Sequence, residues 1–119
     1  MKPSPISCPL AFVLSLAPTF APSGSITAAH AKNHVGEQVT VCGKVASEQT
    51  AVNSHGQPTF INLDSPYPNQ VFTILVWGGD KATVGELPQM GDHACVEGLI
   101  ESYRGVAEIV VRRSGQLTR

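Results

Sequence analysis

Hydrophobic and polar residues alternate along most of the chain that follows Gly36, with the period of two that is typical of β-strands. In residues 37–52, Val39, Val41 and Val45 fall on one face of the expected strand, and Cys42 and Lys44 fall on the other. Gly43, in mid-strand, predicts a bulge or a sharp bend. This segment is therefore expected to be a long, bent first strand.

Two apolar runs at residues 58–63 and 71–77 predict a hairpin whose strands carry apolar side chains on both faces. Residues 93–113 predict a second hairpin that turns at residues 103–105. The last residues, 114–119, could add a further contact at the edge of the sheet.

Alanine-rich residues 25–36 predict a short helix before the first strand, and residues 78–92, which are broken by glycines and a proline, predict an irregular crossover. A bent first strand allows a small sheet to close on itself. The pattern predicts one all-β domain over residues 26–119: a five-stranded OB-fold Greek-key barrel, with a short N-terminal helix and a short irregular crossover between strands 3 and 4.

Residues 1–25 differ from the rest of the chain. Lys2 precedes an apolar run at residues 9–21, and small residues follow at 22–25, which is the layout of a cleavable signal peptide. The apolar run is too short to span a bilayer, so we expect no stable membrane anchor. This layout predicts a periplasmic or secreted protein, and the alternative is a disordered N-terminal tail.

The charge balance and the motifs narrow the functional class. The net charge of −1 and the pI near 6.4 argue against a strongly basic protein that binds nucleic-acid phosphates regardless of base sequence. The chain has no serine elbow, paired-acid motif or glycine-rich phosphate loop, and its four histidines are scattered. We therefore expect a binding protein without enzymatic activity, cofactor or metal.

Several blocks of the chain resemble a family of small bacterial OB-fold proteins: VGEQVTVCGKV, PTFINLDSPYPNQVFTILVWG, GDHACVEGLIESYRGVAEIVV and a final GQL. The proteins of this family are usually described as nucleic-acid-binding domains related to the anticodon-binding type. They occur alone behind a signal peptide or beside extracellular nucleases. The resemblance covers about residues 26–117 and implies an exported OB-fold with a nucleic-acid-binding role.

In OB-folds the usual ligand surface is the open face of strands 2 and 3 and the loops that border it. Aromatic side chains on this face can stack on bases, and basic ones can contact phosphates. Phe60 and Trp77 could instead be buried core residues. The predicted nucleic-acid-binding residues are Lys44, Phe60, Asn62, Thr73, Trp77, Tyr103 and Arg104.

The linker at residues 64–70 contains Pro66 and Pro68, which restrict its backbone. It could act as a preformed structural loop. Alternatively, it could present Tyr67 to a partner at a small cost in entropy.

Cys42 and Cys95 lie on strands that are expected to pair in this fold, which in an oxidising compartment invites a cross-strand disulfide. Two separate buried thiols are the alternative.

The sequence thus leaves two main functional hypotheses. The first is weak binding of single-stranded DNA or RNA. The second is a protein-interaction or envelope-maintenance module of the periplasm, which the acidic net charge favours. An accessory role to a separately encoded nuclease would combine both.

Overall fold

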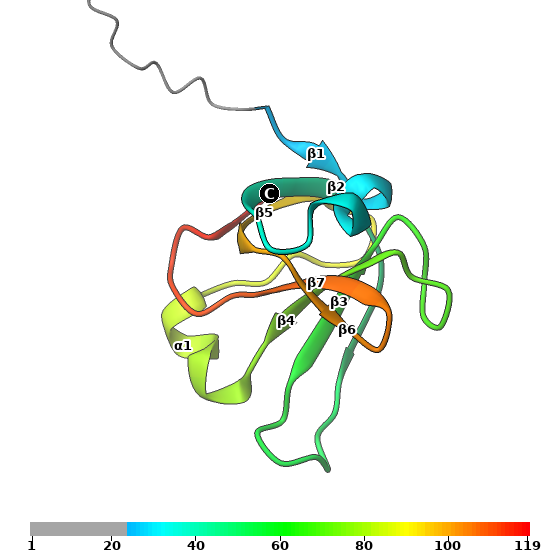
Figure 1. Cartoon of the computed structure of the whole chain (residues 1–119). Coiled ribbons are helices and arrows are strands. Elements are labelled where there is room, and N and C mark those ends of the chain that lie inside the picture. The colour runs from blue at the N-terminus through cyan, green and yellow to red at the C-terminus, as the bar shows by residue number, and fades with distance from the viewer. Residues whose placement is uncertain (1–23) are drawn as a thin grey trace, which may run out of the picture.

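The computed structural model describes residues 24–119, so the predicted signal peptide lies almost entirely outside the described residues. The chain forms an all-β domain with a few short helices (Figure 1). The strands are β1 Ile26–Thr27, β2 Gln38–Thr50, β3 Thr59–Leu63, β4 Phe72–Val76, β5 His93–Leu99, β6 Glu101–Tyr103, β7 Val106–Val110 and β8 Leu117–Thr118. The helices are the 3₁₀ helices η1 Ala28–His34 and η2 Gly78–Asp80 and the α-helix α1 Lys81–Val84.

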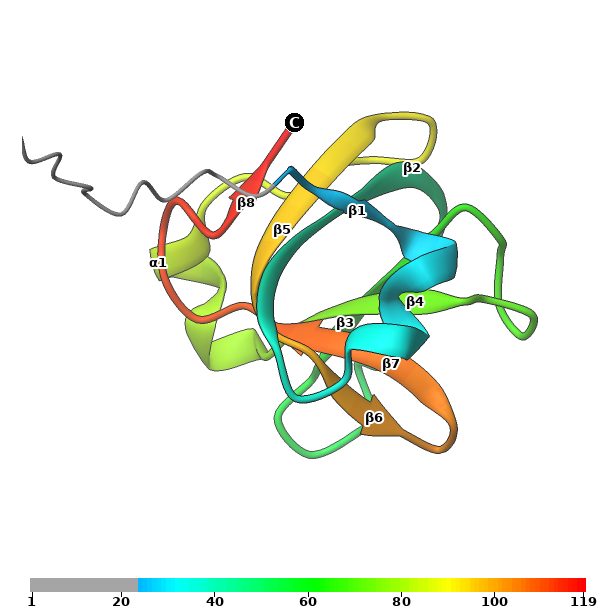
Figure 2. The ribbon, with the colours of Figure 1, turned by 45° about the horizontal axis from the view of Figure 1, so that its top comes forward.

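The strands form one strongly curved sheet in the order β6-β7-β4-β3-β2-β5-β8, and β1 pairs with β2 (Figure 2). All pairs are antiparallel except β1–β2 and β4–β7. Within residues 24–119 no ladder joins β5 to β6 or β7, so the predicted closed barrel is wrong: the sheet is open.

The prediction of five strands is not confirmed either, because residues 24–119 form eight. The expected fourth strand is interrupted at Ile100, whose side chain is buried in the core. The backbone of Ile100 bonds back to the start of β2: its N–H donates to Glu37 O at 3.0 Å, and its carbonyl accepts from Gly36 N at 2.8 Å. Upstream of this break β5 pairs with β2, and downstream of it β6 pairs with β7. The remaining extra strands, β1 and β8, have two residues each.

The prediction of a bent first strand is confirmed. The first half of β2 pairs with β5 and its second half pairs with β3, so one strand serves both parts of the sheet. The register shift lies between Val45 and Ser47, however, and not at the predicted Gly43. Gly43 has another role: a Cβ atom at this position would lie 2.8 Å from Asp64 Oδ1.

The core lies on the concave side of the sheet and consists of aliphatic side chains around Phe72. Ala28 and Ala31 of η1 are fully buried against it, so the predicted N-terminal helix caps the core as a 3₁₀ helix. The predicted crossover after the third strand is η2 and α1 (Figure 1). Among residues 24–119, no helix has the length and apolar character needed to cross a membrane.

Candidate functional site: a groove on the outer face of the sheet

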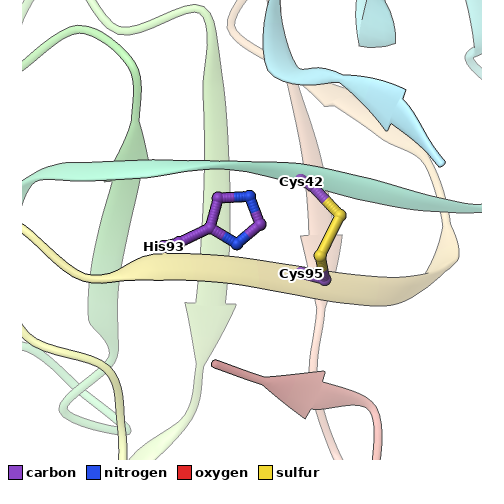
Figure 3. A group of neighbouring side chains, drawn as sticks. All are labelled: Cys42, His93 and Cys95. Atoms are coloured by element: carbon purple, nitrogen blue, oxygen red, sulfur yellow. A yellow bond between two sulfur atoms is a disulfide. The ribbon is translucent and has the colours of Figure 1, made fainter.

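Cys42 and Cys95 are joined by a disulfide, which confirms the predicted bridge (Figure 3). They are direct partners in the β2–β5 ladder. The alternation of β2 therefore placed Cys42 on the correct face, and antiparallel pairing placed Cys95 opposite it. The bridge closes a loop with a sequence separation of 53 residues.

His93 lies beside this disulfide, and one of its ring nitrogens and the two sulfurs all fall within 4.8 Å of one another (Figure 3). Zinc and other soft metals bind cysteine as the thiolate. Because both sulfurs are consumed in the disulfide, the cluster offers one metal ligand in this state, that of His93.

A groove of about 720 Å³ lies on the side of the sheet opposite the core. It crosses β2, β3, β4 and β7 and is bordered by the loop after β3 and the β6–β7 turn. The described residues that line it are Ser47, Glu48, Gln49, Ala51, Phe60, Asn62, Tyr67, Pro68, Gln70, Thr73, Tyr103, Arg104, Val106 and Glu108.

A row of polar residues crosses the sheet along this groove, one from each of five strands in direct register. We call it the polar row. It consists of Ser47 on β2, Asn62 on β3, Thr73 on β4, Glu108 on β7 and Glu101 on β6. Since successive residues of a strand point to opposite faces, the flanking positions on β3, β4 and β7 supply the core.

Hydrogen bonds run along the row in one direction. Thr73 Oγ1 donates to Asn62 Oδ1 at 2.8 Å, and Asn62 Nδ2 donates to Ser47 Oγ at 2.9 Å. The backbone N–H of Tyr67 also donates to Ser47 Oγ, at 3.1 Å, which fixes the proline-containing loop to the sheet. Asn62 and Thr73 are buried, and these bonds satisfy them.

Glu108 lies at the other end of this hydrogen-bonded chain and is only 8% exposed. The Thr73 hydroxyl next to it already donates to Asn62, and within residues 24–119 the Glu108 carboxyl has no hydrogen bond or ion pair. Burial, and secondarily the negative charge of Glu101, raise the pKa of Glu108 above its ordinary value. The buried side-chain oxygen of Gln70, also in the groove lining, likewise has no partner among the described residues.

Aromatic side chains lie around the polar row, which forms the floor of the groove. Phe60 is partly buried, whereas Tyr67 and Tyr103 are 68% and 54% exposed at the rim. The guanidinium carbon of Arg104 lies 5.2 Å from the centre of the Tyr103 ring, within the range of a cation–π contact. Arg104 is the only cationic residue among the described residues that line the groove.

The structure thus brings together five of the seven residues predicted to bind nucleic acid, namely Phe60, Asn62, Thr73, Tyr103 and Arg104, and adds Tyr67 to them.

Two predicted residues lie elsewhere. Lys44 precedes the register shift and pairs with His93, and its backbone N–H donates to Asp64 Oδ1 at 2.9 Å. Trp77 is 37% exposed and covers Gly56, where an added Cβ would lie 2.9 Å from the indole ring. Trp77 is thus neither a core residue nor part of the groove.

Sequence reasoning missed Ser47, Gln70 and Glu108. The period-two pattern of β7 does place Glu108 opposite its buried neighbours, and this signal was available. Ser47 was hidden by the register shift, after which alternation counted from the start of β2 assigns the wrong face.

Comparisons with known proteins support the fold only. No protein-family model matches the chain, and no curated protein matches it. Among solved structures, the chain is similar to OBody AM1L10 bound to hen egg-white lysozyme, with a TM-score of 0.50 and 18% identity over 77% of this chain and 91% of that chain. It also resembles OBody AM2EP06 bound to hen egg-white lysozyme, with a TM-score of 0.49 and 18% identity over 79% of this chain and 91% of that chain.

Proposed function

We propose that this protein is a non-enzymatic, exported binding module of the OB type, and that its groove takes an extended peptide segment of a partner protein. The observation that carries the proposal is Glu108, which is 8% exposed, has no hydrogen-bond partner within residues 24–119 and lines the same groove as Phe60, Tyr67 and Tyr103. Gln70 Oε1, which is buried without a partner among the described residues, lines the same groove, and a ligand that donates to it would remove the cost of leaving it unpaired.

The charges of the groove favour a peptide over a nucleic acid. Glu48 and Glu108 line it, Glu101 extends the polar row, and Arg104 alone provides positive charge. Phosphate groups are attracted by Lys and Arg and repelled by carboxylates, so this groove offers little of the electrostatic term that dominates nucleic-acid affinity. Lys44, which could have added to it, lies outside.

Single-stranded DNA or RNA is the second candidate, because Phe60, Tyr67 and Tyr103 form a set of aromatic side chains around one groove. Base stacking on such side chains contributes about 1–3 kcal/mol per base and tolerates any sequence. The bases would face the sheet, and the phosphates would have to remain in solvent.

The disulfide supports export, since such bonds persist mainly outside the cytosol. The strand order, with a bent β2 that pairs with both β3 and β5 and a parallel β4–β7 pair, supports the assignment to the OB type. Membership of the bacterial OB-fold family described above stays a prediction, as does the signal peptide.

The test compares the two ligand classes on one protein sample. Purified domain is used to capture partners from an envelope extract, and a captured protein is then purified and titrated directly. Labelled single-stranded oligonucleotides are titrated in parallel at 20 and 200 mM salt. We expect Tyr103→Ala to release the protein partner, and Met90→Ala, an exposed change outside the groove, to leave binding intact.

Salt-sensitive oligonucleotide binding that Tyr103→Ala abolishes, without any direct protein partner, would replace the first candidate by the second. The fluorescence of Trp77, which lies outside the groove, should not change in either titration.

A further inference from the structure

The floor of the groove is rich in hydrogen-bond acceptors and poor in donors. Glu108 has a carboxyl group without a donor, and Gln70 Oε1 is buried without one, among residues 24–119. The two residues come from different parts of the chain, β7 and the loop before β4, and line the same cavity. A ligand that satisfies both must bring several N–H groups.

The protein itself cannot easily supply these donors. The hydroxyl of Thr73 and the amide of Asn62 are oriented away from Glu108, toward Ser47, because each is committed to the next member of the polar row. The Arg104 guanidinium lies over the Tyr103 ring, where it forms no ion pair with Glu108 within the described residues. Rotating any of these groups toward Glu108 would break a bond that is already made.

We propose that this floor binds the guanidinium group of an arginine side chain carried by the partner's peptide segment. A guanidinium presents five N–H donors in a plane, pairs with a carboxylate through two parallel hydrogen bonds, and stacks on aromatic rings. Phe60 and Tyr103 provide such rings in the same groove. A lysine ammonium, as a compact point charge, would use the carboxylate but not the planar surfaces. This inference rests on the proposed peptide-binding function and specifies its ligand.

The inference also predicts how binding depends on pH. The groups around Glu108 are Glu101 on β6, Glu48 on β2, and Tyr103 and Arg104 at the β6–β7 turn, with Tyr67 from the loop. Of these, Glu101 disfavours ionisation of Glu108, and a bound guanidinium favours it. Arginine affinity should therefore fall as the pH is lowered from 7 toward 4, because Glu108 becomes protonated and loses its charge.

The experiment uses two pentapeptides, acetyl-Gly-Gly-Xaa-Gly-Gly-amide, in which Xaa is arginine or its neutral analogue citrulline. Binding is followed by amide chemical shifts of the ¹⁵N-labelled protein. We expect the arginine peptide to shift groove resonances and to bind roughly tenfold to hundredfold more tightly than the citrulline peptide, the range expected for hydrogen bonds between charged groups. Glu108→Gln should remove this preference, whereas Glu97→Gln, an exposed change on β5, should keep it.

Equal binding of the two peptides by the wild-type protein, or an arginine preference that survives Glu108→Gln, would overturn the inference. If the protein partner is still released by Tyr103→Ala in that case, the proposed function stands and only its arginine specificity is lost. If oligonucleotides alone occupy the groove, the proposed function fails as well. A Glu108→Gln amide spectrum that matches the wild type outside the groove shows that the variant is folded.

Discussion

The Asp64 carboxylate lies directly against the backbone of Gly43, so that a side chain on Gly43 would begin 2.8 Å from Asp64 Oδ1. The same carboxylate accepts the Lys44 N–H, and the Asp64 N–H donates to the Lys44 carbonyl at 2.7 Å. Asp64 is the first residue after β3 and has a φ of 69°. This contact joins the end of β3 to β2 just before the register shift.

Gly43→Ala should therefore lower the free energy of unfolding by about 1–3 kcal/mol, as expected when a group is forced into an occupied space. Urea denaturation measures the change. Gly79→Ala is the matched control, because nothing lies within 4 Å of a Cβ at that position, and it should be close to neutral. In the Asp64→Ala background the Gly43→Ala cost should shrink; an unchanged cost would mean that Asp64 is not its cause.

Replacing both Cys42 and Cys95 by alanine should destabilise the domain by about 4 kcal/mol, since the disulfide restricts the unfolded chain over a long loop. The separation of 53 residues sets this magnitude. Denaturation of the double variant, compared with wild-type protein kept oxidised, gives the value. Reduced and alkylated wild-type protein should behave like the variant, and a loss below about 1 kcal/mol would contradict the chain-entropy account.

Thr73→Val should cost about 1–3 kcal/mol, because it keeps the shape of the side chain but leaves the buried Asn62 Oδ1 without a donor. Thr83→Val, the same exchange at an exposed position of α1, serves as the control. Equal stability of the two variants in urea would show that the hydrogen bond within the polar row contributes little.

The stability of the protein should also depend on the ionisation of Glu108. Burial, and then Glu101, raise its folded-state pKa above the ordinary value of 4.5, so the unfolded chain loses this proton first as the pH rises. The stability contributed by Glu108 is full below pH 4.5 and is lost as the pH rises to the folded-state pKa.

Glu108→Gln, which cannot ionise, should therefore stabilise the protein more at pH 7 than at pH 4. Denaturation curves at both pH values test the sign, and Glu101→Gln should reduce the effect by removing its second cause. If Glu108→Gln is instead less stable, relative to the wild type, at pH 7 than at pH 4, the pKa of Glu108 is not raised in the folded protein.

Alternation of residue types predicted the longer strands well, because β2, β3, β4, β5 and β7 each have one buried face or two. The bridge between Cys42 and Cys95 was predicted from that pattern together with the strand pairing expected of the fold, and the residues of β2 up to Lys44 do keep one register with β5. The open sheet could not be predicted in this way. It depends on Ile100, an apolar residue in an apolar run, whose backbone bonds to residues far earlier in the chain.

The site was predicted in part because alternation shows which residues of a regular strand share a face. Asn62 and Thr73 follow regular strands, so their shared face was visible in the sequence. Lys44 lies outside the groove because of the bend of β2, and Trp77 lies outside it because its indole covers Gly56. Neither feature produces a periodic pattern in the sequence. The acidic part of the groove was missed because glutamates are mostly exposed, whereas Glu108 is 8% exposed.

The two shortest strands attach beside the disulfide: Thr27 pairs with Cys42, and Thr118 pairs with Cys95 (Figure 2). Each of these strands forms only two ladder pairs, although Ile26 and Leu117 also pack against the core. Reduction of this one covalent link would loosen the β2–β5 pair to which both outer strands attach, and proteases cut frayed chain most readily. In a protease-rich environment, the redox state of one sulfur–sulfur bond would therefore affect the lifetime of the domain.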